Sequence, residues 1–407
     1  MSGQTIDKTT NLIGVLLLIS VLFFPDITVS KNLPSFQLSD FIVPILMIFL
    51  FIKKGYLLLK FYSYFILLFI GYILFTILIN LSINSISDYL EMYKFFKYLI
   101  VLLFILILDV NFFISKVLKP IFILLVIVNL VHFFELFGIN RIIEKYYNGG
   151  LNITYFGRNT LGELTSKRMV GLIGNPNNNA LLFLFFSSAF FCLNKSKENL
   201  IYFLIAMTMT FMCQSRTILI CVGVLILFFS IYKTIHSKKE LWSYLFIIVA
   251  SYFIAWMLSS RFFTVDIYSN SLFNGVGIKS NSVLGRIESW KFIGKHIFQK
   301  PLFGHGPNKS FFYTKNLYSE NEYILYMYRY GVIGLIFYLG IFLFPIWRFY
   351  KKIKLNTNNL LIIPILIILV SALTNNPFTE RNIQIVFCFF FGFCLQTLIR
   401  KNDSQKI

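Results

Sequence analysis

The sequence has too few charged residues for a water-soluble protein. Only 13% of its 407 residues are Asp, Glu, Lys or Arg, whereas 57% are hydrophobic. A soluble domain carries about 25% charged residues, so this chain lacks the polar side chains that a water-facing surface needs. We therefore expect an all-α polytopic membrane protein, formed by residues 1–407 as a single integral membrane domain.

Two further absences in the sequence narrow the class of membrane protein. No small-residue cleavage site follows the first apolar stretch at 11–24, so the N-terminus is not expected to be a cleavable signal. The five cysteines show no metal-ligand spacing and no evident disulfide pairing, and all of them lie in or beside apolar segments. We expect them to be packing residues, and we expect neither a metal nor a cofactor.

Long apolar stretches fill most of the chain. A membrane-spanning helix needs about 20 mostly apolar residues, and by that rule the sequence predicts about twelve spans. They are 11–24, 38–53, 58–80, 90–108, 118–137, 178–193, 198–214, 216–233, 241–259, 322–347, 358–375 and 381–400.

The distribution of basic residues predicts the orientation of these spans. The net charge of +20 is divided among the connections between spans, which does not favour nucleic acid as a partner. With the N-terminus inside, the inner segments hold eighteen Lys and Arg residues and the short outer loops hold three, Lys31, Arg216 and Arg381. Positive residues favour the cytoplasmic side, so both termini are predicted to be cytoplasmic. Two long segments, 138–177 and 260–321, are then extracytoplasmic.

The larger outer loop contains a predicted amphipathic helix. Apolar residues recur there at helical spacing, at Leu284, Ile287, Trp290, Ile293 and Ile297. Such a helix can lie on a membrane surface, with Trp290 and nearby lysines held by lipid headgroups. Pro301 ends the pattern, and His305 lies between two glycines in a turn whose backbone can approach a ligand closely.

Three other groups of polar residues are predicted at the outer face. Arg216 follows an apolar stretch with almost no loop, where an arginine either faces an anion or extends to lipid headgroups. Glu320 and Glu322 stand at the outer end of a predicted helix, with Arg329 deeper along it. A role in capping that helix is an alternative to a role in chemistry.

The last of these groups precedes the span at 178–193. Arg168 lies just before a Gly-rich turn, and the asparagines at 177–179 follow that turn. Asparagine is a favoured residue at a helix start, so Asn177 and its neighbours can be explained as caps. Capping does not explain Arg168.

These groups together suggest one kind of chemistry. The planar guanidinium of arginine suits phosphate oxygens, and a nearby carboxylate can remove a proton from a hydroxyl. A site at the membrane edge that combines both suits a lipid-linked diphosphate attacked by an alcohol.

The order of short motifs resembles a known superfamily. An Arg four residues before a Trp and a later Pro-Leu-Phe-Gly-His-Gly are followed by Glu-Asn-Glu-Tyr and Tyr-Gly-Val-Ile-Gly-Leu. Ser-Arg-Thr and Arg-Met-Val-Gly-Leu-Ile-Gly-Asn-Pro-Asn come earlier. This order over residues 168–335 resembles the bacterial O-antigen polymerase and O-antigen ligase superfamily. The resemblance implies a metal-independent inverting glycosyltransferase of the GT-C type in the bacterial inner membrane. Its substrates would be undecaprenyl-diphosphate-linked oligosaccharides, for O-antigen, lipopolysaccharide or capsule synthesis.

The resemblance also implies roles for particular residues. Arg216 matches the arginine of the Ser-Arg motif and Arg286 the arginine before Trp290, so both are expected to bind the donor diphosphate. Glu320-Asn321 fills the position at which the ligase branch has His-Asn. Glu320 is therefore a candidate base, with Glu322 and His305 as alternatives, and the predicted catalytic residues are Glu320, Arg216 and Arg286. The predicted substrate-binding residues are Arg168, Asn177, Trp290, His305, Asn321, Glu322 and Arg329.

Three functions follow from this interpretation. The first is a polymerase of lipid-linked repeat units, with a chain-length regulator protein as a further partner. The second is a ligase that transfers glycan to lipid A-core, which the absence of the His disfavours. The third is a flippase or transporter of lipid-linked sugars. Transporters usually place charged residues near the membrane midplane, whereas the polar residues here gather at the outer edge.

Overall fold

The structure is a computed structural model, and its described part is helical. It describes residues 3–27, 36–53, 55, 59–81, 84–147, 168–193, 196–236, 238–262, 281–315, 317, 319–349 and 362–403. No strand occurs within these ranges, and Ile27 and Phe36 form an isolated antiparallel bridge. Parts of the two predicted outer loops, 148–167 and 263–280, lie outside the described residues.

Contacts divide the chain into two units. The first consists of residues 1–39, 109–276 and 366–371, and the second of residues 40–108, 277–365 and 372–407. The prediction of a single integral membrane domain stays a prediction.

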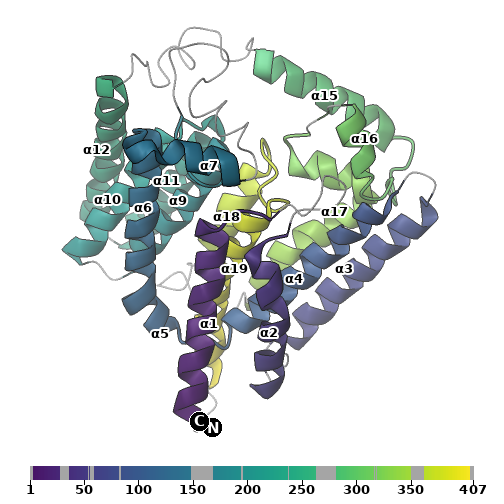
Figure 1. Ribbon diagram of the computed structural model, residues 1–407, viewed down its shortest axis with the longest axis horizontal. Coiled ribbons are helices and arrows are strands. Elements are labelled where there is room, and N and C mark those ends of the chain that lie inside the picture. The colour runs from purple at the N-terminus through teal and green to yellow at the C-terminus, as the bar shows by residue number, and fades with distance from the viewer. Residues whose placement is uncertain are drawn as a thin grey trace. The chain divides into compact units, whose positions relative to one another are not determined.

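The first unit is built around four neighbouring helices, α9 to α12, with α10 packed against α9 and α12 (Figure 1). Its helices are α1 (Gly3–Phe23), α5 (Val110–Phe112), α6 (Leu118–Phe133), α7 (Ile139–Tyr146), α9 (Pro176–Cys192), α10 (Lys197–Met212), α11 (Arg216–His236) and α12 (Lys238–Phe262). A π-helical turn at Phe113–Val117 joins α5 to α6, and a 3-10 turn at Leu136–Gly138 precedes α7.

In the second unit α4 packs against α3 and α19, and α17 packs against α3 and α15. The helices are α2 (Leu38–Ile52), α3 (Lys60–Ile79), α4 (Leu90–Ile105), α15 (Asn281–Ile297), α16 (Lys309–Thr314), α17 (Glu322–Phe349) and α19 (Arg381–Asp403), with a 3-10 turn at Ile86–Tyr89. Helix α18 (Ile362–Ser371) contributes its first residues to this unit and the remainder to the first unit.

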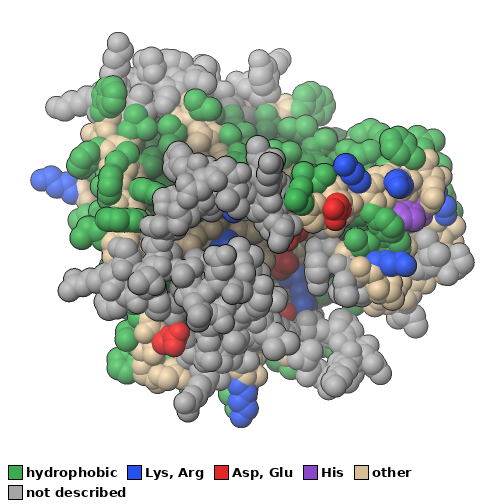
Figure 2. All heavy atoms as spheres, turned by 90° about the horizontal axis from the view of Figure 1, so that it is seen from above, with side chains coloured by type: hydrophobic (Ala, Val, Ile, Leu, Met, Phe, Trp, Pro, Cys, Tyr) green, Lys and Arg blue, Asp and Glu red, His purple; other side chains and the backbone are tan. Residues whose placement is uncertain are grey.

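Five helical segments of the described part are long and apolar enough to cross a membrane. They are Lys60–Ile79, Val110–Phe133, Trp242–Ser259, Glu322–Phe349 and Arg381–Ile399. In the first four, no more than 39% of the apolar window is buried inside the protein, and Figure 2 shows hydrophobic side chains on much of the described surface in that view. Such a surface suits lipid, so the protein is a helical membrane protein with several spans. The total of twelve spans and their orientation stay predictions.

Local sequence explains where several helices begin. Asn175 caps α9, because its side-chain oxygen accepts hydrogen bonds from the backbone N–H groups of Asn177 and Asn178, and Pro176 is the first helical residue. The prediction that residues 177–179 cap this helix was wrong, because the cap lies two residues earlier. Ser196 caps α10 through the N–H of Asn199.

Helix α17 is interrupted at Gly331. This residue has φ of 64° and ψ of −167°, a conformation that only glycine adopts without strain. An added Cβ would overlap the carbonyl of Leu302. The interruption leaves nearby backbone N–H and C=O groups without their helical hydrogen bonds. In a membrane segment, other parts of the protein must supply those hydrogen bonds.

The segment that follows α15 supplies those partners. The N–H of His305 donates to the carbonyl of Tyr328 at 3.0 Å, and the N–H of Gly306 donates to the carbonyl of Arg329 at 2.8 Å. The N–H of Val332 donates in turn to the carbonyl of Pro301 at 2.9 Å. The glycine-flanked turn therefore holds the broken part of α17.

Candidate functional site

An arginine and a carboxylate meet in the second unit. The Nε of Arg286, on α15, donates to Oε2 of Glu320, which lies just before α17. The Arg286 side chain is 25% exposed and that of Glu320 41% exposed, so both can be reached by a substrate. Two residues predicted to be catalytic are thus direct partners.

The backbone of Glu320 has an unusual conformation. Its φ is 40°, in the left-handed region that non-glycine residues seldom occupy. Such strain persists only where the surrounding structure enforces it, and it concentrates at functional sites. The contacts on both sides of Glu320 provide that enforcement.

Neighbouring residues hold the backbone at Glu320 in place. The indole N–H of Trp290 donates to the carbonyl of Ser319, and the Ser319 hydroxyl bonds with the side chain of Asn376. On the other side, Asn321 donates from Nδ2 to the carbonyl of Leu373 at 2.9 Å and accepts from the N–H of Ile324. Trp290 and Asn321, both predicted to bind substrate, therefore position the segment that carries Glu320.

Glu322 lies in a different environment from Glu320. It is fully buried, and its carboxylate accepts hydrogen bonds from the hydroxyl of Thr379 at 2.6 Å, the hydroxyl of Tyr338 at 3.0 Å and the N–H of Phe378 at 3.1 Å. These bonds tie the start of α17 to the α18–α19 connection. In this structure the Glu322 carboxylate is fully engaged in holding the fold.

His305 is packed inside the second unit. Its ring stacks on Tyr328 with centroids 4.8 Å apart, and Nε2–H donates to the carbonyl of His296 at 2.9 Å. Burial lowers the pKa of the His305 imidazole below its usual value. Arg329 lies one residue beyond Tyr328, and its guanidinium stands 5.7 Å from the ring of Phe312.

The predicted amphipathic helix is present as α15, and its apolar face covers protein. Ile293 and Ile297 are buried against Tyr328, with Phe311 and Phe312 beside them. Leu284, near the start of the helix, is 45% exposed. Ile293 and Ile297 therefore pack α15 on α17, while Leu284 and Phe292, which is 38% exposed, stay partly uncovered.

The first unit holds the other predicted site residues. Arg168 donates from Nη2 to Oδ1 of Asn177 at 3.1 Å and from Nε to the carbonyl of Cys213 at 3.2 Å. The hydroxyl of Ser215 donates to the same Asn177 oxygen at 2.7 Å. Arg168 and Asn177 are thus joined to the turn directly before Arg216.

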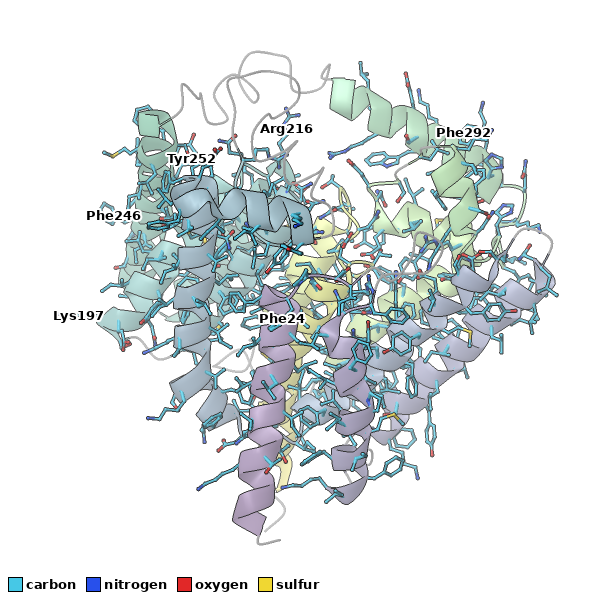
Figure 3. All side chains as sticks on the ribbon, viewed as in Figure 1. Phe24, Lys197, Arg216, Phe246, Tyr252 and Phe292 are labelled. Carbon is cyan, nitrogen blue, oxygen red and sulfur yellow. The ribbon has the colours of Figure 1, made fainter. Side chains whose placement is uncertain are left out.

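Arg216 is the first residue of α11 and is partly exposed. Figure 3 shows it at the opposite end of the first unit's helices from Lys197, the first residue of α10. Gln214, two residues before it, has φ of 49°, so both units contain a strained backbone beside a predicted site residue. Arg216 belongs to the first unit and Arg286 to the second, and their joint action stays a prediction.

A group of charged residues on α4 was not predicted from the sequence to be functional. Glu91 is buried, with Lys94 and Lys309 each 3.0 Å from its Oε1 and Arg329 3.5 Å from its Oε2. Lys97, on the same helix, pairs with Asp40. The signal was available, since ionisable residues inside a predicted span are functional candidates.

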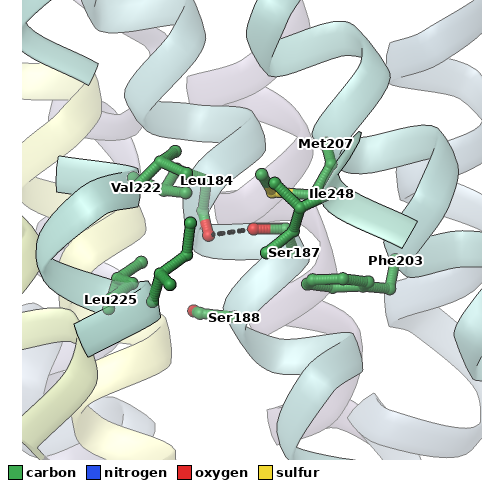
Figure 4. Close-up of a pocket in the computed structure, with 9 residues that line it drawn as sticks. Leu184, Ser187, Ser188, Phe203, Met207, Val222, Leu225 and Ile248 are labelled. Atoms are coloured by element: carbon green, nitrogen blue, oxygen red, sulfur yellow. Dashed lines mark hydrogen bonds between the residues drawn. The ribbon is translucent and has the colours of Figure 1, made fainter. Parts of the chain in front are cut away.

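A small cavity lies among α9, α10, α11 and α12. Figure 4 shows its lining, which includes Leu184, Ser187, Phe203 and Val222, with the Ser187 hydroxyl bonded to the Leu184 carbonyl at 2.8 Å. Its volume of about 10 Å³ is roughly the room for one water molecule. It is too small for a sugar or a diphosphate.

No group of three or more His, Cys, Asp and Glu side chains suited to a metal occurs within the described ranges. The expectation of a metal-independent reaction stays a prediction.

Comparison with known proteins identifies part of the chain. Residues 201–339 match the family model described as O-antigen ligase. No curated protein matches the chain. The matched residues include Arg216, Arg286, Trp290, Glu320 and Arg329, so the match supports a membrane enzyme of the O-antigen ligase or polymerase type acting on lipid-linked sugars. The resemblance to the O-antigen ligase and polymerase superfamily is confirmed: the chain carries a domain of the O-antigen ligase family at residues 201–339.

Proposed function

We propose that the protein is a polysaccharide polymerase, which joins undecaprenyl-diphosphate-linked oligosaccharide repeat units on the outer face of the plasma membrane. The observation that carries the proposal is the contact between Arg286 and Glu320. It places a phosphate-binding group beside a carboxylate, and the carboxylate lies at the position where the ligase branch has a histidine.

In the proposed mechanism, the arginines and Glu320 have different roles. Arg286, with Arg216, binds the diphosphate of the donor and stabilises it as the leaving group. The donor's C1–O bond breaks while a hydroxyl of the acceptor repeat unit attacks C1 from the opposite face, which inverts the anomeric centre. Glu320 accepts the proton of that hydroxyl. When the diphosphate binds, it replaces Glu320 as the partner of Arg286. The Glu320 carboxylate is then available as a base.

The fixed backbone around Glu320 supports this role. Trp290 and Asn321 hold the residues on either side, so the carboxylate is presented from a rigid segment. A base must stay within hydrogen-bonding reach of the proton that it removes. Rigid attachment serves that requirement better than a flexible loop would.

The ligase is the second candidate, because the matching family model is described as O-antigen ligase. The two functions share a donor and differ in the acceptor. The glycan ladder of a strain that lacks the gene distinguishes them. Loss of a polymerase leaves a single repeat unit on the final acceptor, whereas loss of a ligase leaves no repeat unit there. A ladder of normal length in the deletion strain contradicts the proposed polymerase.

A further inference from the structure

The charged group around Glu91 has more positive than negative charge. Lys94, Lys309 and Arg329 surround this one carboxylate. Among the residues that the structure describes, one further carboxylate contacts these three cations: Asp88, which accepts from the backbone N–H of Lys309 at 3.0 Å. Three cations therefore face two anions in a largely buried place.

Arg329 is the least satisfied member of the group. Its side chain is 10% exposed, its contact to Glu91 is 3.5 Å long, and its Nε is buried without a hydrogen-bond partner. A buried donor without a partner destabilises the protein, and more so when the group is charged. The lysines have additional partners, the carbonyl of Thr379 for Lys94 and that of Ser87 for Lys309.

A purely structural network would be expected to balance its charges and satisfy its donors. Here the surplus is positive, and the cations are closer to the surface than the carboxylate. The side chains of Lys94 and Lys309 are 20% and 16% exposed, against 4% for Glu91. An anion that approached from outside would meet the cations first.

We propose that Lys94, Lys309 and Arg329, arranged around Glu91, form an anion site that binds a phosphate group. A phosphate offers several oxygens to the arginine fork and to two ammonium groups. If the proposed function holds, on which this assignment rests, the phosphate belongs to the second lipid-linked diphosphate, that of the acceptor. Arg216 and Arg286 serve the donor. Glu91 holds the three cations together while the site is empty.

The test measures binding of inorganic pyrophosphate to the full chain in detergent by titration calorimetry. It uses the Arg216→Ala, Arg286→Ala double variant, which removes the proposed donor contacts. Pyrophosphate is expected to bind this protein still. Adding Arg329→Gln should weaken binding about tenfold or more, because a charge-assisted partner is lost. Lys309→Gln is the second variant, should Arg329→Gln fail to fold. Lys295→Gln removes an exposed charge of α15 and should leave the affinity unchanged.

Glu91→Gln is the more discriminating variant, because it is predicted to raise the affinity for pyrophosphate, whereas Arg329→Gln and Lys309→Gln are predicted to lower it. Removing the internal carboxylate raises the surplus charge, so pyrophosphate should bind more tightly. The proposal is overturned if the double variant binds no pyrophosphate, if folded Arg329→Gln and Lys309→Gln proteins bind it as before, or if a folded Glu91→Gln protein binds it no more tightly. Because no turnover is measured, these outcomes are independent of whether the protein polymerises glycan.

The source of the phosphate is identified in lipid nanodiscs. If farnesyl diphosphate displaces pyrophosphate in phosphatidylcholine discs, the site accepts a lipid-linked diphosphate. If phosphatidylglycerol discs alone suppress pyrophosphate binding, the site binds a lipid headgroup. If neither lipid displaces pyrophosphate, the assignment to a lipid phosphate is overturned.

Discussion

Arg286 on α15 pairs with Glu320, a residue held in a left-handed backbone conformation directly before α17. The two residues come from separate parts of the chain, and the contact depends on α15 packing against α17 through Ile293 and Ile297. In the proposed mechanism, a diphosphate that binds Arg286 would release Glu320, and substrate binding would then be coupled to the presence of a base.

The arginines are the first group to test. Arg216→Ala and Arg286→Ala should each abolish polymer while the protein still inserts into the membrane. Arg→Lys at either position should recover little, since a point charge does not replace the bidentate fork. Glycan ladders and membrane abundance measure both effects. Wild-type ladders from both lysine variants would mean that the arginines only contact lipid headgroups.

Glu322→Gln should affect stability instead of chemistry. A glutamine keeps one acceptor oxygen, so at least one of the partners Tyr338, Phe378 and Thr379 loses its acceptor in a buried site. The expected cost is about 1–3 kcal/mol, seen as a lower thermal midpoint in detergent. Activity per folded molecule should stay near that of the wild type. Normal stability with lost activity would transfer the role of base to Glu322.

Gly331→Ala tests the interruption of α17. An alanine there would be strained and would overlap the Leu302 carbonyl, so we expect a loss of at least about 1 kcal/mol. Gly294→Ala is the matched control, because Gly294 lies in α15 with open space around its Cβ position. That change should be neutral or stabilising by about 0.5–1 kcal/mol. Equal thermal midpoints for the two variants would contradict the role given to Gly331.

Membrane orientation is tested with reporter fusions. Fusions at residues 155 and 300 should be extracytoplasmic, and those at 237 and 352 cytoplasmic, because eighteen basic residues lie on the predicted inner side against three in the short outer loops. A cytoplasmic reporter at 300 would place Arg286 and Glu320 on the wrong side for substrates presented outside.

Local patterns in the sequence predicted what depends on local structure. Long apolar runs indicated the helices, and the spacing from Leu284 to Ile297 indicated α15 inside the large loop. The two glycines around His305 indicated a turn, and both have positive φ. In each case neighbouring residues alone decide the outcome, through hydrophobicity or backbone freedom.

Contacts between segments that are distant in the sequence could not be predicted from it. Nothing local indicates that the turn at His305 holds the broken part of α17, or that Glu322 bonds to Thr379. Glu320 and Glu322 looked equivalent in the sequence because they are the same residue type, two positions apart, at the start of the same predicted helix. They differ because tertiary packing buries one carboxylate and leaves the other beside Arg286.

The most direct test of the account is polymerisation by purified Glu320→Gln protein supplied with undecaprenyl-diphosphate-linked repeat units. Glutamine keeps the size of the side chain and one acceptor oxygen but is not a base, and a general base is typically worth about 10²–10⁴-fold in rate. The account predicts a loss of that order in the rate, at unchanged folding and membrane abundance. A polymerisation rate within a few-fold of the wild type would contradict it, because the carboxylate would then be only a structural partner of Arg286.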